Sequence, residues 1–163
     1  MMKTRSSADK KNEKLPETEA FYDAFVERML EEDYRIIDIF PERVKEDYAS
    51  QFSITESYHR KKERLSKIYE TYGEIILFLN CYFDLVFRFK EDAFEQLEDS
   101  EGFMKRFTKI ESGKYFEALF IKESVMITLD HDDTSMTFYG RNKELEDLME
   151  KLCQAKGAFF WKR

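Results

Sequence analysis

Apolar residues in the first half of the chain recur every third or fourth position, which is typical of amphipathic helices. Phe21, Phe25 and Met29 lie four residues apart, so residues 16–32 are expected to form a helix that packs against a core. The next apolar run, residues 34–40, is short, rich in isoleucine and followed by a proline. We expect a strand or an extended connector there, and then a brief helical turn.

A longer apolar stripe predicts a second helix that begins near Thr55 and reaches the region of Tyr82. The stripe is shorter than the roughly three or four heptads that indicate a coiled coil, so a core-facing helix is the better interpretation. Its members follow alternating steps of three and four: Leu65, Ile68, Tyr72, Ile75, Leu79 and Tyr82.

Residues 82–90 fit two patterns. Apolar side chains alternate with polar ones at Leu85, Phe87 and Phe89, which favours a strand, but the preceding helical frame also continues through this stretch. We expect the strand. A short helix through Phe94 and Leu97 and a loop over residues 99–102 should follow it.

The last third of the chain predicts an antiparallel sheet. Three β-prone runs cover residues 115–121, 125–129 and 134–139. Asn142 is a good N-cap for a helix that Gly157 ends. Residues 158–161 then form a final strand, expected near a sheet edge because Lys162 and Arg163 follow it at once.

Together these elements predict an α+β fold, in which N-terminal helices pack with a C-terminal antiparallel sheet and one C-terminal helix. A chain of 163 residues is most simply one domain. Residues 1–15 are polar and lysine-rich, so we expect a disordered basic tail, with residues 16–163 as the single domain. Aromatic residues make up 16 % and charged residues 37 % of the chain, which indicates an aromatic core under a charged surface.

The negative charge is concentrated outside the tail. Residues 3–14 carry +3, which leaves −10 for the rest of a chain whose net charge is −7. An acidic body argues against nucleic-acid and membrane partners, and it is compatible with a basic protein partner. The pattern does not indicate an oligomeric state.

The sequence also predicts a cytoplasmic protein. No run approaches the roughly 20 apolar residues of a transmembrane helix, and the N-terminal stretch lacks the apolar segment of a secretory signal. Cys81 and Cys153 lie among apolar residues at helical spacing, so both are expected to be buried, reduced thiols.

The densest group of potential ligands is an acidic tip between two of the predicted strands. It consists of Asp130, His131, Asp132 and Asp133. Carboxylates and imidazole bind metal ions, but this spacing lacks the glycine and the distant glutamate of an EF-hand loop. We interpret the tip as a solvated hairpin end, with Asp132 and Asp133 as candidate interaction residues, and we predict no metal site.

Signatures of catalysis and of cofactor binding are lacking. His59 and His131 are the only histidines, and neither has a nucleophile motif nearby. There is no Glu-x-Lys triplet of the nuclease type and no glycine-rich phosphate loop, so we predict no cofactor. Pairs of carboxylates are too numerous, among thirty-four acidic residues, to identify a catalytic pair.

The end of the chain holds the densest aromatic group. Strand alternation places Phe159 and Trp161 on one face and Phe160 on the other, so at least one face should pack in the core. If the face that carries Phe160 is not covered, that residue is a candidate for partner contact.

These patterns lead to two hypotheses of different classes. The first is a non-enzymatic intracellular interaction protein of an inhibitor, immunity-type or adaptor kind, whose acidic surface covers a protein partner. The alternative is a small metal-dependent enzyme or regulator that uses the Asp130–Asp133 tip. A convergent pocket around the tip would favour the enzyme, and a flat or convex acidic face would favour the binding protein. Nucleic-acid binding has only the basic tail in its favour.

Overall fold

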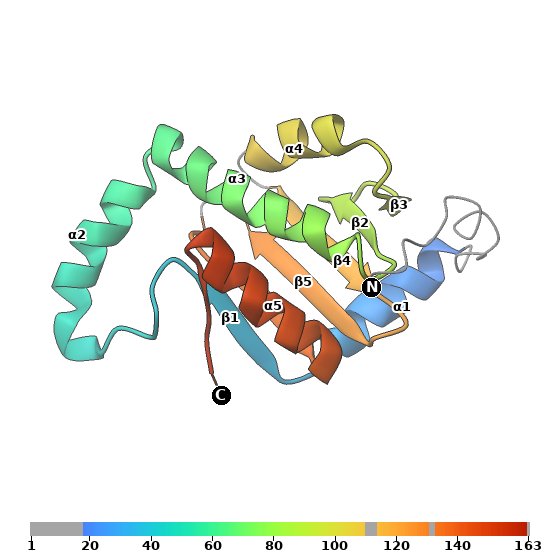
Figure 1. Ribbon diagram of the computed structural model, residues 1–163, viewed down its shortest axis with the longest axis horizontal. Helices are drawn as coiled ribbons and strands as arrows, with labels where there is room; N and C mark the ends of the chain where they lie inside the picture. Colours follow the sequence, from blue (N-terminus) through green and yellow to red (C-terminus); the bar gives the residue numbers. More distant parts are fainter. Residues whose placement is uncertain (1–17, 110–113, 131–132, 163) are drawn as a thin grey trace.

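The computed structural model describes residues 18–109, 114–130 and 133–162 (Figure 1). The predicted disordered tail, residues 1–15, lies outside the described residues, as do His131 and Asp132 of the acidic tip. No helix in these ranges is long and apolar enough to cross a membrane.

A seven-stranded antiparallel sheet forms the centre of the molecule, with strand order β3-β2-β4-β5-β6-β1-β7. Most strands bury apolar side chains on at least one face, and the central strand Tyr115–Phe120 buries five consecutive residues, because both of its faces are covered. The strands are β1 (Tyr34–Asp38), β2 (Val86–Phe89), β3 (Glu95–Gln96), β4 (Tyr115–Phe120), β5 (Val125–Asp130), β6 (Met136–Gly140) and β7 (Phe159–Phe160).

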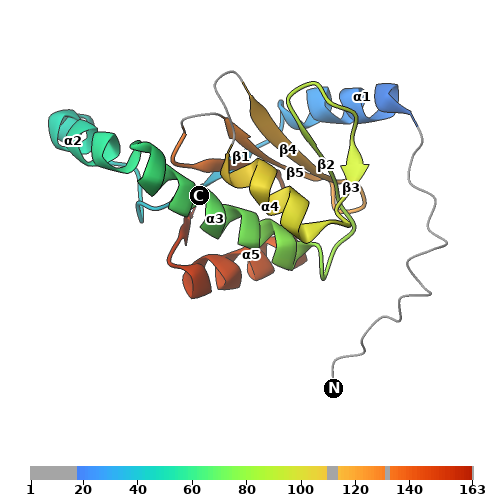
Figure 2. The same ribbon diagram turned by 90° about the horizontal axis from the view of Figure 1, so that it is seen from above.

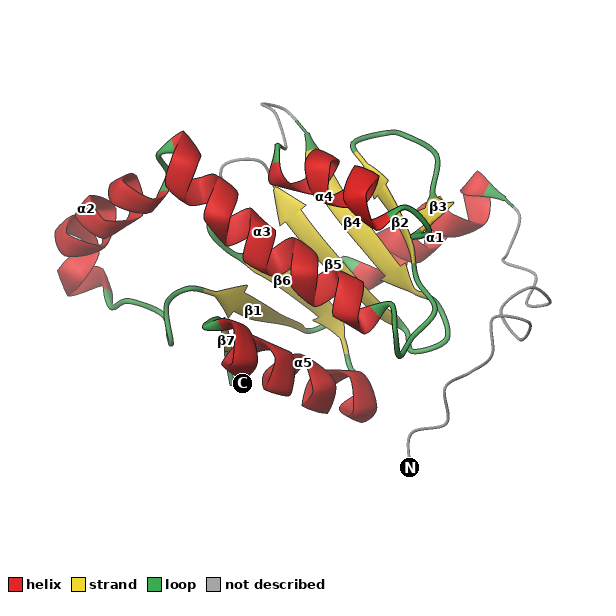
Figure 3. Ribbon diagram, turned by 45° about the horizontal axis from the view of Figure 1, so that its top comes forward, coloured by secondary structure: helices red, strands yellow, loops and turns green. Residues whose placement is uncertain are grey.

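Helices cover the two faces of the sheet unequally (Figures 2 and 3). One face carries α3 (Lys62–Leu79), α4 (Ser100–Thr108) and α5 (Lys143–Lys156), which enclose the larger core. The other face carries α1 (Glu19–Met29), which packs a smaller apolar cluster on β2, β4 and β5.

The larger core contains a dense group of aromatic rings, as the composition predicts. The rings of Phe107 and Phe116 meet edge to face with centroids 4.9 Å apart, and those of Phe87 and Phe103 are 5.1 Å apart. Each such pair contributes about 0.5–1.5 kcal/mol beyond the burial of its area. These contacts fix α4 against β2 and β4.

The described residues form a small α+β domain, as predicted, but its helices and strands are interleaved. The first-half strand β1 lies between β6 and β7 and pairs with both. The predicted division into N-terminal helices and a C-terminal sheet is therefore too simple. Pairing between distant segments decides this arrangement, and no local pattern encodes it.

Two helix assignments also need correction. The predicted helix through Phe94 and Leu97 is instead irregular chain around β3, and the predicted loop at residues 99–102 is the start of α4. The side chain of Asp99 accepts a hydrogen bond from the amide of Gly102 and so caps α4.

The predicted helix from Thr55 is in fact two helices. A 3-10 turn η2 (Glu46–Tyr48) leads into α2 (Ala49–His59), and α3 begins afresh at Lys62. Lys61 between them has an extended backbone, with ψ at 136°. As a result α2 projects away from the sheet, at the left of Figure 1.

Most of the other predicted elements are confirmed. Residues 86–89 form a strand, Asn142 caps α5, and Gly157 ends it with a left-handed backbone at φ 75°. Cys153 is buried, but the prediction for Cys81 was wrong. Because α3 ends at Leu79, Cys81 falls in the exposed turn after it.

Candidate functional site

An open groove of about 470 Å³ runs along the β7 edge of the sheet. Three segments line it: the loop after β1, the last turns of α5, and β7 with its flanking residues. The lining residues are Pro41, Glu42, Arg43, Glu150, Cys153, Gln154, Ala158, Phe159, Phe160, Trp161 and Lys162. Its volume lies within the range of about 300–1,000 Å³ that is usual for binding pockets.

Arg35 of β1 holds the C-terminal segment in place. Its Nε donates to the carbonyl oxygen of Trp161 at 2.7 Å, and its guanidinium lies 3.5 Å from the ring centroid of Phe160. Glu146 of α5 pairs with the same guanidinium at 3.4 Å. Arg35 therefore joins β1, α5 and β7, which meet at the groove.

Trp161 fixes the loop on the opposite wall. Its indole Nε1 donates to the carbonyl oxygen of Phe40 at 2.8 Å, and its backbone amide donates to the carbonyl oxygen of Ile36 at 2.8 Å. These bonds connect the end of β7 to the chain just before Pro41. Hydrogen bonds within the protein therefore hold this wall of the groove in place.

The edge strand directs some of its backbone groups away from the sheet. Successive residues of a strand point their amide and carbonyl groups to opposite sides. Since the amide of Trp161 faces β1, the amide and carbonyl of Phe160 face away from β1, on the side where the described residues add no further strand. Such groups are available to an added strand.

The aromatic group divides between core and surface. Phe160 is only 7 % exposed, and its ring lies 5.1 Å from that of Phe138 in the core. Phe159 is 42 % exposed. An interaction role for Phe160 stays a prediction, but a much larger fraction of Phe159 is accessible to a partner.

Asp38 supports the base of the loop wall. Its carboxylate Oδ1 accepts a hydrogen bond of 2.7 Å from the amide of Ile39, although the residue is only 7 % exposed. The pKa of this carboxyl is raised to about 6, mainly because the group is buried and also because the charges of Glu56 and Asp133 are nearby, while hydrogen bonds from Ile39 and Phe40 oppose the increase.

The thiol in the groove is unreactive at neutral pH. Burial raises the pKa of Cys153 to about 12, against a smaller lowering by Arg35. The nucleophilic form of cysteine is the thiolate, so Cys153 stays protonated. No histidine is among the lining residues that the structure describes.

The described residues of the acidic tip are Asp130 and Asp133. Asp130 ends β5 and is exposed. The backbone oxygen of Asp133 accepts a hydrogen bond of 2.9 Å from the hydroxyl of Tyr69, which anchors the loop to α3. Neither residue lines the groove.

A metal centre is not visible in the described part of the chain. Within residues 18–109, 114–130 and 133–162, no group of three or more His, Cys, Asp or Glu side chains could hold an ion. Because two of the four candidate ligands of the tip lie outside these ranges, the metal hypothesis stays a prediction.

Reasoning from the sequence found only part of the groove. It identified the aromatic residues and the edge position of the last strand, but not the contributions of Pro41–Arg43 or of Glu150 and Gln154. In the sequence, Pro41 indicates only the end of a strand. That loop and α5 line the same groove because β1 lies beside β7.

Comparisons with known proteins do not identify the chain: no protein-family model, curated protein or solved structure matches it.

Proposed function

We propose that the protein is a non-enzymatic interaction domain that binds an extended segment of a partner protein along β7. One observation carries this proposal. The groove runs beside a sheet edge, where the exposed ring of Phe159 adjoins the outward-facing peptide groups of Phe160. A segment that adds a strand to such an edge gains backbone hydrogen bonds, and pockets beside the edge select its side chains.

The chemistry of the lining supports binding more than catalysis. Its apolar part comes from Pro41, Ala158 and the aromatic residues, and the thiol of Cys153 stays protonated. An inhibitor, an immunity-type protein or an adaptor would each use such a surface.

The groove itself does not select one sign of charge. Glu42 and Glu150 line it together with Arg43 and Lys162. The preference for a basic partner comes instead from the net charge of −7, which accelerates the approach of a positively charged protein. The alternative is a metal-dependent enzyme or regulator centred on Asp130–Asp133, and titration with divalent cations tests it.

A selection from a random peptide library, followed by mapping of the selected peptides by amide NMR shifts, tests the proposal. The shifts should concentrate in residues 41–43, 150–154 and 158–162. Phe159→Ala should weaken binding about tenfold or more, as expected for an aromatic contact residue. Phe21→Ala is a matched control, because Phe21 has the same 42 % exposure but lies on α1.

Backbone N-methylation of the selected peptides separates strand addition from simple apolar contact. Methylation at the positions that pair with β7 should abolish binding, because it removes the donors that a ladder requires. The groove proposal fails if the shifts map elsewhere, if both phenylalanine variants weaken binding equally, or if no selected peptide binds more tightly than about 1 mM.

A further inference from the structure

The projecting helix α2 lacks the packing that normally stabilises a helix of its length. None of its 11 residues is buried, and its main contacts are with η2 and α3. Helices shorter than about 12–15 residues are marginal in water without tertiary packing. The N-cap residue Tyr48 also makes no capping hydrogen bond through its side chain.

The outward face of α2 is uncharged, although charged residues make up 37 % of the chain. Phe52, Glu56 and His59 are partly buried and mark the inner face. Ser50, Ile54 and Ser57 lie on the opposite face at the same helical spacing, and all three are exposed.

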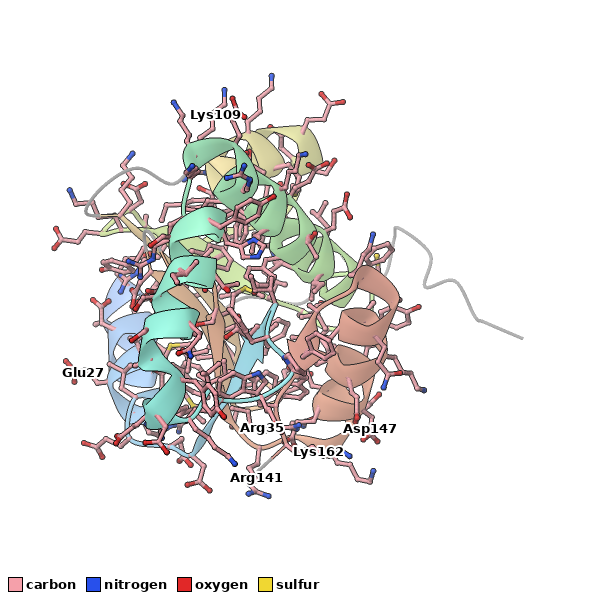
Figure 4. All side chains as sticks on the ribbon, turned by 90° about the vertical axis from the view of Figure 1, so that its left-hand side faces the viewer. Glu27, Arg35, Lys109, Arg141, Asp147 and Lys162 are labelled. Atoms are coloured by element: carbon pink, nitrogen blue, oxygen red, sulfur yellow. The ribbon has the colours of Figure 1, made fainter. Side chains whose placement is uncertain are left out.

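This outward face has the form of a helix-packing surface. Ile54 is 72 % exposed, which is the highest exposed fraction among the large apolar residues of the described chain. Serines on either side allow another backbone to approach closely. Figure 4 faces α2, and no other element lies between the helix and the viewer. A solvent-exposed helix face normally carries charges instead.

Charged residues of opposite sign flank this face. Glu46 and Asp47 precede α2, and Lys61 and Lys62 follow it, without ion pairs to any residue that the structure describes. Ile54 lies seven residues from both Asp47 and Lys61. The helix dipole of α2 accounts for the signs at its own two ends, but it does not account for the uncharged face between them.

We infer that α2 pairs with α2 of a second copy of the chain, antiparallel and two-fold symmetric about Ile54. This arrangement places Asp47 opposite the partner's Lys61 and Lys61 opposite the partner's Asp47. It also aligns the two helix dipoles favourably. A two-fold interface must be self-complementary in this way, because every contact between one residue of the first copy and another residue of the second copy occurs twice.

The pairing is expected to be weak. A helix of 11 residues is about 16 Å long, so two of them bury less than the standard interface of about 1,600 Å². We expect a dissociation constant on the order of 100 μM. The inference concerns α2 alone and does not depend on the groove.

Sedimentation equilibrium of the full chain between about 10 μM and 1 mM tests the pairing. The wild type should dimerise over this range, and Ile54→Asp should weaken dimerisation at least tenfold. Circular dichroism checks that the variant is folded, which is expected because Ile54 is exposed. Tyr82→Asp is the matched control, since Tyr82 is a 51 % exposed aromatic outside α2.

Charge reversal then tests the antiparallel register. Asp47→Lys and Lys61→Glu should each weaken self-association, because each places like charges opposite one another at both ends. An equimolar mixture of the two variants should associate at least tenfold more tightly than either alone. A wild type that is monomeric at 1 mM, a dimer unaffected by Ile54→Asp, or a mixture no tighter than its components would overturn the inference.

Discussion

Replacing Asp38 by asparagine should stabilise the protein at pH 7 and above, and should have little effect near pH 4. The carboxyl of Asp38 is buried at the base of the groove wall, with Glu56 and Asp133 as like-charged neighbours. Its pKa is raised from 3.8 to about 6, so ionisation is more costly in the folded chain than in the unfolded chain. Asparagine is neutral, and its side-chain oxygen can still accept the hydrogen bond from the amide of Ile39.

The size of the effect follows from proton linkage. Between pH 3.8 and about 6 the folded protein binds more protons at Asp38 than the unfolded chain does, so this group's contribution to the free energy of unfolding decreases as pH rises. A difference of about two pKa units, at about 1.4 kcal/mol each, corresponds to about 3 kcal/mol. This contribution is fully present below pH 3.8 and is lost above pH 6. Asp38→Asn should therefore raise the free energy of unfolding by up to about 3 kcal/mol at pH 7.5.

Urea unfolding of the wild type and the variant at pH 4.5, 5.5, 6.5 and 7.5 measures the difference directly. Other titrating groups are common to both proteins and largely cancel. Asp92→Asn is the control for the loss of one surface carboxylate, because the side chain of Asp92 is 66 % exposed. The reasoning is refuted if Asp38→Asn is destabilising at pH 7.5, or if its effect does not change with pH.

Three further predictions concern other parts of the chain. In the native protein a bulky thiol reagent should label the exposed Cys81 readily and leave Cys153 unmodified, because Cys153 is buried and its pKa is raised to about 12. Mass spectrometry of the labelled peptides distinguishes the two cysteines, and rapid labelling of Cys153 would contradict its buried position. Deletion of residues 1–14 should lower the melting temperature by less than about 5 °C in a calorimetric scan, since this polar segment has little apolar area to bury. A larger decrease would show that the tail stabilises the fold. Asp132→Asn combined with Asp133→Asn should leave the melting temperature unchanged or slightly higher. Calorimetric titration of the wild type with Ca²⁺, Mg²⁺, Mn²⁺ and Zn²⁺ should detect no binding tighter than about 100 μM. Low-micromolar binding that the double variant abolishes would favour the metal-dependent alternative.

Local signals were sufficient for much of the secondary structure. Asn142 and Gly157 bound α5 because the first can cap a helix through its side chain and the second tolerates a left-handed backbone. The hairpin between β5 and β6 follows from two alternating runs close together in the sequence. Such features depend on residues a few positions apart, which the sequence shows directly.

Features that depend on contacts between distant segments of the chain could not be predicted from the local sequence pattern. Phe103 and Phe107 are spaced for a helix, but they gain their stability from aromatic rings on β2 and β4. The break between α2 and α3 has no glycine or proline to mark it. The apolar spacing around Cys81 predicts a buried helix face, but α3 ends at Leu79 and Cys81 lies in the exposed turn after it.

The sequence by itself determined an acidic α+β domain with an aromatic core and a short final strand near a sheet edge. Only the tertiary structure decided where that edge lies and what surrounds it. The groove exists because β1, from the first half of the chain, pairs with β7 and carries Pro41–Arg43 opposite α5. Hydrophobic burial is not directional, so the apolar pattern selects which face of each strand is buried. It does not select which distant strand becomes the neighbour.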